Sequence, residues 1–400
     1  DIRITGGEIT VSAEGLGAAI GGYAGVDCGN ITIQGNVIKS VISSGAGACI
    51  GGASNRSAGS ITISNAKLPP LNGTSLIGWI RGNTAGSLTI QNCYIESTDT
   101  AAGSGIQVSD NGNIRIENSE VKLPEKRDIR AGDGGSIVIH DSTIHSNGIY
   151  MLGNLNEAKT LKRLEITGST VVTAGNVIGA MGSRASVDEI VIHGSSLSPA
   201  EGADHYYAIG GGESASFGSI DIQGSQINIP LASSGAAIGG GNYAAYSGES
   251  TIRIANSQVT TATGARLSAA IGTGNASQGT GSLKIFIESS NVTAKGGPLR
   301  QNTDYVPGIG KYDRITLQVH IQVMDSTVES FRHTKRDSDE LVYDDLHEKN
   351  LPGVPAENIS ICGSTVNGTR IDHSFDEYGK CTLCGKYDLG YCYEHGLLTM

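Results

Sequence analysis

The sequence predicts an all-β protein folded as a parallel β-helix, a solenoid of about twelve stacked coils. Three observations predict this fold. The 400-residue chain contains 58 glycines, and only 5% of its residues are aromatic. A strand-like motif recurs at intervals of about 23 to 32 residues, and a glycine-rich motif recurs between its copies. Self-similarity at such a period is typical of stacked repeats, each of which buries its apolar face against its neighbours.

The strand motif is an apolar–polar–apolar triplet followed by a turn and another apolar residue, as in "ITIQGNVI" at 31–38 and "IVIHGSSL" at 190–197. The alternation predicts a strand with one buried face. Gly, Asn or Asp occupies the bend, often with Ser next, and these residues tolerate left-handed backbone conformations. We expect the first apolar residue of each triplet to form a buried ladder. Its members are Ile31, Ile61, Leu88, Ile114, Ile137, Leu164, Ile190 and Ile220.

The glycine motif predicts a second corner of each coil. It reads "GAAIGG" at 17–22, "GACIGG" at 47–52, "GAAIGGG" at 235–241 and "SAAIGTG" at 268–274. We expect its Ile to point into the core and its glycines to form a corner where stacked backbones approach closely. A leucine-rich-repeat solenoid is disfavoured because the L-x-x-L-x-L pattern is absent. An antiparallel sandwich is disfavoured because hairpin turns would not keep this register.

The charge and the missing motifs exclude several classes of function. The net charge of −11 disfavours nucleic acid as a partner, because such binding depends on Lys and Arg that neutralise phosphates. No apolar run approaches the ~18 residues of a transmembrane helix. The sequence contains no GxSxG, HExxH, P-loop or Rossmann motif.

The repeats resemble a known group of proteins. The segments "GAAIGGG" and "STIRIANSQVTTATG" look like the Gly-rich right-handed β-helix repeats of secreted and surface proteins of anaerobic Firmicutes. Many of those proteins are described as carbohydrate-binding, and the resemblance covers most of residues 1–330. It implies a right-handed helix, a secreted or cell-surface protein whose signal peptide has been removed, and a carbohydrate partner. Because such helices also host hydrolases, lyases, adhesins and inert stalks, these functions stay open.

The middle coils depart from the glycine corner, and we expect their unusual residues to form one lateral patch. An aromatic ring can stack on a sugar, while Asp and Arg side chains bind hydroxyl or uronate groups. The expected ligand-binding residues are Trp79, Arg81, Asp110, Arg127, Arg130 and Tyr150. Asp128 and Asp133 are candidates for a catalytic carboxylate pair or for calcium ligands. The alternative is a longer loop that carries solvated charges, with Trp79 filling a corner.

This patch leads to three functional hypotheses. The first is a protein that binds carbohydrate on a lateral face, the second is a polysaccharide hydrolase or lyase, and the third is a non-catalytic stalk or adhesin. The position just before the bend is polar in successive coils, which predicts a polar ladder along the rod. The alternative is an acid–base pair of Glu117 and His140. The ladder comprises Gln91, Glu117, His140, Thr167, His193 and Gln223.

The composition changes after residue 330, which divides the chain into a β-helix at 1–330, a charged insertion with a final coil at 331–371, and a tail at 372–400. The insertion predicts a short helix around 339–348, and the final coil is expected at 359–366. We expect the tail to cover the C-terminal strand edges. The N-terminal edge looks bare, which favours an upstream segment or an oligomer.

The tail contains a zinc-knuckle spacing, "CTLCGK", followed by "CYEH". Cys381, Cys384, Cys392 and His395 make a tetrahedral Cys₃His set, with His373 as a substitute ligand. The segment also resembles the H-x-F-D-x-x-G-x-C-x-x-C-G tails of secreted Firmicutes proteins. Four protein ligands leave no open position, so we expect a structural zinc that contributes to folding. Disulfide bonding of these cysteines is the alternative.

Overall fold

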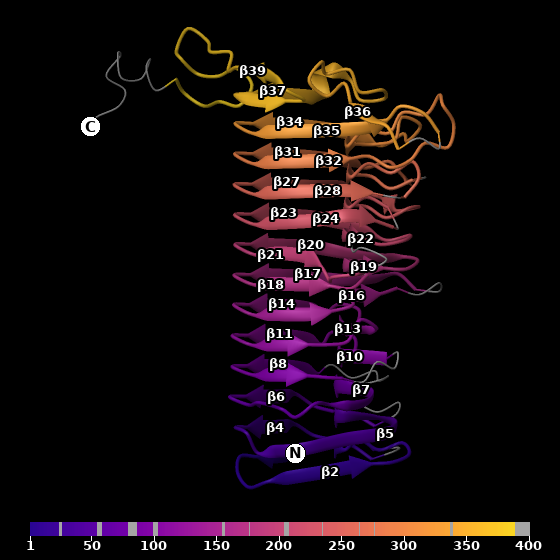
Figure 1. Ribbon diagram of the computed structural model, residues 1–400, viewed down its shortest axis with the longest axis vertical. Coiled ribbons are helices and arrows are strands. Elements are labelled where there is room, and N and C mark those ends of the chain that lie inside the picture. The colour runs from indigo at the N-terminus through magenta and orange to yellow at the C-terminus, as the bar shows by residue number, and fades with distance from the viewer. Residues whose placement is uncertain are drawn as a thin grey trace, which may run out of the picture.

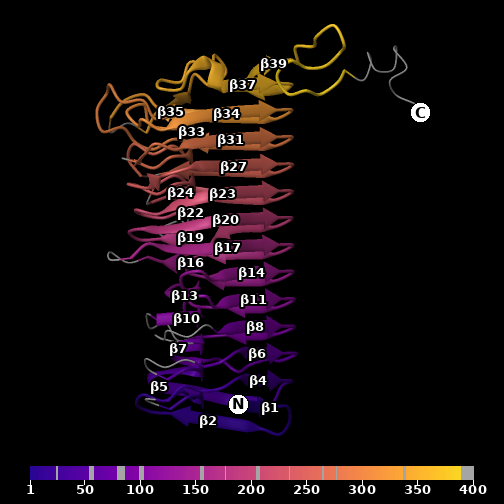
Figure 2. The same cartoon turned by 180° about the vertical axis from the view of Figure 1, so that it is seen from behind.

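The chain winds into a rod of stacked coils, with the N-terminus at one end and the last coil at the other (Figure 1). The structure is a computed structural model, and it describes residues 1–388 except 24–25, 54–57, 79–85, 99–102, 154–156, 176, 204–207, 234, 264, 276 and 337–338. Three parallel sheets run along the rod, and the view from behind shows the same regular stack (Figure 2). The predicted all-β parallel β-helix is confirmed.

The first sheet contains 13 strands in the described residues. They are β1 (Ile2–Ile4), β4 (Ile31–Gln34), β6 (Ile61–Ser64), β8 (Ser87–Gln91), β11 (Asn113–Glu117), β14 (Ser136–His140), β17 (Lys159–Thr167), β20 (Ala185–His193), β23 (Ser216–Gln223), β27 (Glu249–Ala255), β31 (Ser282–Glu288), β34 (Gln318–Met324) and β37 (Ile359–Cys362).

The second sheet carries the glycine corner at the end of its strands. They are β2 (Ile9–Ala13), β3 (Ile20–Gly21), β5 (Ile38–Gly51), β7 (Asn72–Gly78), β10 (Gly103–Gln107), β13 (Arg127–Arg130), β16 (Ile149–Leu152), β19 (Ile178–Met181), β22 (Ile209–Gly211), β25 (Ile238–Gly239), β29 (Ile271–Gly272) and β33 (Ile309–Gly310).

The third sheet follows the Asn/Gly bend. Its strands are β9 (Tyr94–Glu96), β12 (Glu120–Lys122), β15 (Thr143–Ser146), β18 (Thr170–Thr173), β21 (Ser196–Pro199), β24 (Gln226–Ala232), β28 (Gln258–Thr263), β32 (Asn291–Lys295), β35 (Thr327–His333), β36 (Leu341–Tyr343), β38 (Ser364–Val366) and β39 (Thr369–Ile371). A small separate pair is formed by β26 (Ala245–Tyr246) and β30 (Gln278–Gly279).

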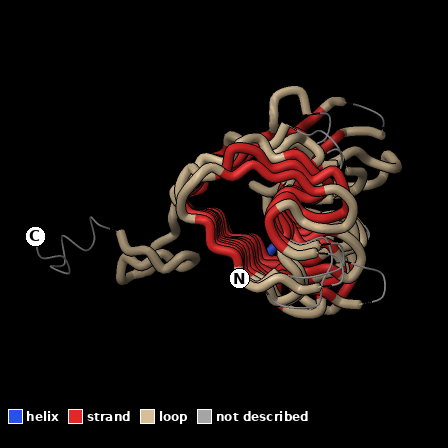
Figure 3. Tube along the Cα trace, turned by 90° about the horizontal axis from the view of Figure 1, so that it is seen from below, coloured by secondary structure: helices blue, strands red, loops and turns tan. Residues whose placement is uncertain are grey.

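Seen along the rod, the strands of each sheet superimpose (Figure 3). Among the described residues, the full three-strand cross-section runs from the coil of β8 to the coil of β33. The coils of β1, β4 and β6 supply strands to the first two sheets only. Eight described coils supply a strand to all three sheets, so the predicted count of about twelve coils is too high. In the coil of β6, Pro69 and Pro70 follow the bend, and proline cannot donate to a strand ladder.

The predicted aliphatic ladder is confirmed. The eight residues from Ile31 to Ile220 pair directly from coil to coil, and each is at most 1% exposed. The Ile residues of the glycine motif form a second buried ladder in the second sheet, which includes Ile209, Ile238 and Ile271. The core is therefore a set of apolar columns that run the length of the rod.

The glycine corner brings successive backbones into close contact, as predicted. Gly239 has a φ of +136°, and a Cβ at this position would overlap the carbonyl oxygen of Gly272 in the next coil. The same left-handed conformation recurs along this column, at Gly21, Gly51, Gly78, Gly179, Gly210, Gly239, Gly272 and Gly310. The glycine motif repeats because a side chain would collide with the neighbouring coil.

A buried serine column fixes the Asn/Gly bend. The Oγ of each serine accepts the backbone N–H of the equivalent residue in the preceding coil at 3.0–3.1 Å, starting with Cys93 and ending with Ser326. The accepting residues are Ser119, Ser142, Ser169, Ser195, Ser225, Ser257, Ser290, Ser326 and Ser364. The serine that follows the bend in the motif therefore satisfies a buried amide.

The predicted helix around 339–348 is wrong. Leu341–Tyr343 forms β36, which pairs antiparallel with β35 and stacks Tyr343 on Phe331 at 4.8 Å. The free edge of β35 offers backbone hydrogen bonds that a helix could not use. The predicted final coil is confirmed as β37 and β38. The described residues contain one helical turn, the 3₁₀ helix η1 (Ala356–Asn358), and no helix among them is long and apolar enough to cross a membrane.

Candidate functional site

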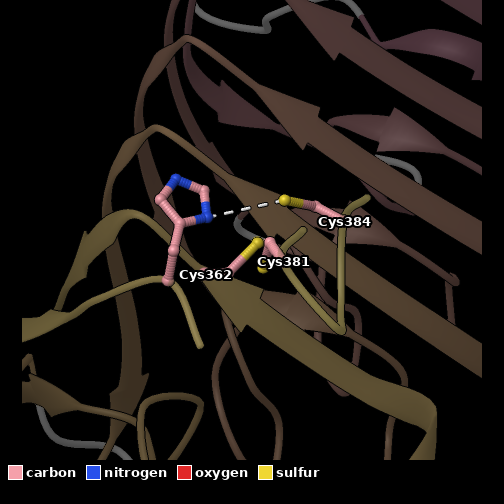
Figure 4. Close-up of side chains that lie close together, drawn as sticks. Cys362, Cys381 and Cys384 are labelled. Atoms are coloured by element: carbon pink, nitrogen blue, oxygen red, sulfur yellow. Dashed lines mark hydrogen bonds between the residues drawn. The ribbon is translucent and has the colours of Figure 1, made fainter. Parts of the chain in front are cut away.

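A Cys₃His cluster lies where the tail meets the last coil (Figure 4). Cys362 ends β37, and His373, Cys381 and Cys384 come from the segment that follows β39. One ligand atom from each residue lies within 4.8 Å of all the others. The Nδ1 of His373 is 3.5 Å from the Sγ of Cys384. This cluster could hold a metal ion.

The second ring nitrogen of His373 is fixed by a carboxylate. Its Nε2 lies 2.9 Å from the Oδ1 of Asp325, the left-handed bend residue that follows β34. Lys386 from the tail pairs with the other oxygen of Asp325. A carboxylate behind a histidine is the usual outer partner of a metal-ligating imidazole, because it orients the ring and raises its basicity.

The local electrostatics favour a thiolate at Cys381. Burial raises the pKa of this thiol, but hydrogen bonds from the backbone N–H groups of Cys384 and Leu383, and from His373, lower it to about 6. The hydrogen bond with Cys381 is the main reason that the pKa of His373 is raised, and Asp325 adds to it. Since the thiolate is the form that binds metals, the donor set fits a closed, four-ligand site.

The close approach of His373 to the last coil depends on a glycine. Gly363 follows Cys362 with a φ of +60°, and a Cβ there would overlap the imidazole of His373. The lack of a side chain at position 363 therefore allows both the left-handed bend and the close approach of the His373 imidazole.

Of the predicted metal ligands, Cys381, Cys384 and the substitute His373 lie together in this cluster. Cys392 and His395 lie outside the described residues. Cys362 is not among the ligands predicted from the sequence, because this residue belongs to the repeat rather than to the tail. Its position at the end of an "ISIC" triplet, where other coils carry Gln, Glu or His, is a signal that could have found it. The cysteines among the described residues form no disulfide.

The middle coils replace the glycine column by larger residues. In register with Gly78 and Gly179, the successive coils carry Gln107, Arg130 and Tyr150. The guanidinium of Arg130 lies 5.2 Å from the centre of the Tyr150 ring. The structure therefore brings two of the predicted ligand-binding residues together.

Asp128 lies at the centre of this cluster. Its Oδ2 pairs with Arg130 and accepts a hydrogen bond from the Tyr150 hydroxyl at 3.0 Å, and its Oδ1 accepts one from Asn147 at 3.0 Å. Asp128 and Tyr150 are each 1% exposed, whereas the Arg130 side chain is 27% exposed. Burial, followed by the charge of Asp128, raises the pKa of Tyr150. Arg130 is thus the accessible part of a buried ion-pair network.

The other predicted residues have different roles in the coil. Arg127 is fully buried and donates to the backbone carbonyls of Gly73, Thr74 and Ser104. Trp79 and Arg81 lie outside the described residues.

Asp110 and Asp133 bridge successive coils. The Oδ1 of Asp110 accepts the backbone N–H of Asp133 at 2.9 Å, and the Oδ1 of Asp133 accepts that of Thr160 at 2.7 Å. The two candidate catalytic carboxylates therefore have separate partners. Asp128 belongs to a buried ion pair with Arg130, and Asp133 accepts the backbone N–H of Thr160.

The predicted polar stripe is present along the first sheet. Glu117 and His140 lie side by side in adjacent coils, as expected. Glu117 pairs with Arg115 in its own strand, and the Nδ1 of His140 lies 3.0 Å from a carboxylate oxygen of Asp141. Each member of the suggested acid–base pair thus has another charged partner.

An open groove of about 660 Å³, which the sequence analysis did not identify, follows the bend between the first and third sheets. Four exposed asparagines line it, from the coils of β4, β6, β8 and β11, and Asn65, Asn92 and Asn118 hold left-handed conformations with φ of 45° to 53°. The side-chain amide of Asn92 donates to that of Asn65 at 3.0 Å. The sequence predicts these asparagines as bend formers, and their stacking into one surface is a property of the coil register.

Tyr94 is the aromatic residue of this groove. It is half-buried, and its hydroxyl donates to Glu96 at 2.8 Å. The Nζ atoms of Lys67 and Lys122, from the two adjacent coils, lie 5.2 and 5.3 Å from its ring centre. Asn36, Ser119, Glu120, Asp141 and Thr143 complete the polar lining.

Comparisons of the chain with protein-family models, with curated proteins and with solved structures found no match.

Proposed function

We propose that this protein is a non-catalytic carbohydrate-binding β-solenoid, whose binding surface is the groove along the Asn bend. The observation that carries the proposal is the column of carboxamides, Asn65, Asn92 and Asn118, beside the ring of Tyr94. Carboxamides offer both donors and acceptors, which match the hydroxyl groups of sugars. The ring of Tyr94 lies beside them, with the ammonium groups of Lys67 and Lys122 as its neighbours.

The spacing of the coils supports a polysaccharide rather than a single sugar. Stacked strands repeat every ~4.8 Å, which is close to the length of one residue in an extended polysaccharide. A chain that lies along the rod would therefore meet one carboxamide at each sugar. The hydrogen bond from the side chain of Asn92 to that of Asn65 orders these two carboxamides before binding, which lowers the entropy cost of association.

The hydrogen bonds of the carboxylates favour binding over cleavage. Asp128 already accepts three protein donors, and Asp133 accepts a backbone amide. A general acid or nucleophile needs an oxygen directed at substrate. The hydrolase or lyase hypothesis therefore gains less support than carbohydrate binding. We retain the expectation of a secreted or surface protein, which rests on the resemblance of the repeats.

We also propose that the Cys₃His cluster holds one structural zinc ion. Three thiolates and one imidazole are the donor set of structural zinc sites, and four protein ligands leave no position for substrate. Burial raises the pKa of the Cys362 thiol, so a bound cation would offset the cost of its ionisation. The ion would tie the tail to β37.

A glycan array that includes plant, fungal and host polysaccharides tests the binding proposal. We expect the wild-type protein to bind a defined set of glycans and Tyr94→Ala to weaken that binding by about tenfold. Asn92→Ala should weaken it about three- to tenfold, as expected for a lost hydrogen bond. Tyr23→Ala, at a 77% exposed tyrosine outside the groove, is the matched control and should bind normally. Binding that survives Tyr94→Ala and Asn92→Ala unchanged would reject the groove.

A further inference from the structure

A second pocket, of about 420 Å³, lies among the loops on either side of β29 and β33, beyond the coils that form the Asn groove. Its apolar part consists of Leu267 and Ile315, each 5% exposed. Asn275 and Gln278 add carboxamides. Arg300 and Arg314 both line the pocket and are exposed. The volume is within the usual range for small-ligand sites.

The Asp304 carboxylate holds together the loops that form this pocket. Its Oδ2 accepts the backbone N–H groups of Arg300 and Gln301 at 3.1 and 2.6 Å. Its Oδ1 accepts the Tyr312 hydroxyl at 2.9 Å and pairs with the guanidinium of Arg314 at 3.1 Å. The carboxylate is 1% exposed, so its oxygens are committed to these neighbours. Asp304 thereby fixes the loop that carries Arg300 and orients Arg314.

The two arginines leave positive charge available at the pocket. No carboxylate among the described residues pairs with Arg300, and Asp304 is the single acid among the described lining residues. A guanidinium has five N–H donors, and the ion pair of Arg314 with Asp304 uses one of its nitrogens. In a chain of net charge −11, this local excess of cation points to an anionic ligand.

We propose that this pocket binds the anionic group of an acidic sugar, and that this group is the carboxylate of a uronic acid residue. A planar carboxylate matches the fork of a guanidinium, and two guanidinium groups at one pocket can share it. Asn275 and Gln278 would then meet ring hydroxyls, and Leu267 and Ile315 would contact the apolar face of the sugar. This site is distinct from the Asn groove and does not depend on it.

Isothermal titration calorimetry with three short oligosaccharides of equal length tests the proposal. One is an oligogalacturonate, one is a sulfated oligosaccharide and one is neutral. We expect the oligogalacturonate to bind, with an affinity that falls as the salt concentration rises. We expect Arg300→Gln to weaken this binding at least about tenfold, the effect of losing a charged hydrogen bond. Arg253→Gln, at a surface ion pair of the first sheet, is the matched control and should leave it unchanged.

Further outcomes separate this proposal from its alternatives. Arg314→Gln should also weaken binding, and its circular dichroism and thermal unfolding must match the wild type for the result to count, because Arg314 contacts Asp304. Tyr94→Ala should leave the affinity for oligogalacturonate unchanged, even if it weakens glycan binding at the Asn groove. Equal affinity for the neutral oligosaccharide, preference for the sulfated one, no binding, or full binding by Arg300→Gln would each overturn the uronate assignment.

Discussion

Replacement of Ser195 by alanine tests whether the buried serine column holds the bends of the solenoid. Ser195 is 4% exposed, and its Oγ accepts the backbone N–H of Ser169 in the preceding coil at 3.1 Å. The same hydroxyl donates to the carbonyl of His193 at 2.8 Å. Ser195→Ala removes this hydroxyl with little change in shape, so the Ser169 amide is left without its partner.

The cost follows from that one amide. An unpaired buried N–H group destabilises a protein by about 1–3 kcal/mol. Since every 1.4 kcal/mol is a factor of ten, opening at this bend should become about 5 to 150 times more frequent. In a solenoid each coil contacts its neighbours, so the effect should be strongest in the coils of β17 and β20 and fade along the rod.

Hydrogen–deuterium exchange measures this effect where it arises. The peptide that contains Ser169 should exchange faster in Ser195→Ala, while a peptide from the coil of β31 should not change. Ser196→Ala is the control, because Ser196 is the next residue and lies partly exposed in β21. Equal protection of the Ser169 segment in Ser195→Ala and wild type would show that the serine column does not hold the bends.

Three further substitutions test the core, the glycine corner and the metal cluster. Ile190→Ala should lower the free energy of unfolding by about 2–5 kcal/mol in urea titrations, because this fully buried residue leaves a cavity between its two ladder neighbours; a loss below about 1 kcal/mol would contradict its place in the core. Gly239→Ala should lower the thermal unfolding temperature or prevent folding, because the added Cβ overlaps the carbonyl of Gly272; a wild-type melting curve would argue against the close corner. Cys362→Ser should reduce zinc from about one ion per chain in elemental analysis and loosen the tail to limited proteolysis, whereas Cys28→Ser should keep the metal; full zinc content in Cys362→Ser would remove this residue from the site.

The fold could be predicted because the same pattern of buried and exposed residues, followed by the same kind of bend, recurs in coil after coil. Each triplet indicates which residues are buried, and the Gly, Asn or Asp that recurs after it marks a left-handed bend. The region 339–348 has no such repetition. Its apolar residues suit a helix as well as a strand, and the free edge of β35 decided between them.

The candidate sites were harder to predict because they depend on neighbours that are distant in sequence. Cys381 and Cys384 could be recognised from their spacing, whereas Cys362 becomes a candidate ligand only when the tail folds back on β37. Asn65 and Asn92 appear in the sequence as separate bend formers. Coil register places them in one groove, and no local pattern states that register.

Affinity as a function of oligosaccharide length tests the central claim most directly. If one sugar meets one coil of the Asn groove, each added residue should tighten binding until the oligosaccharide spans the stacked asparagines from Asn65 to Asn118, and longer oligosaccharides should add little. In Asn92→Ala, the sugar residue that would meet position 92 should add little affinity, so the total gain with length should be smaller than in the wild type. An affinity that does not depend on length, or a gain with length that Asn92→Ala leaves intact, would contradict the proposed alignment of a polysaccharide along the rod.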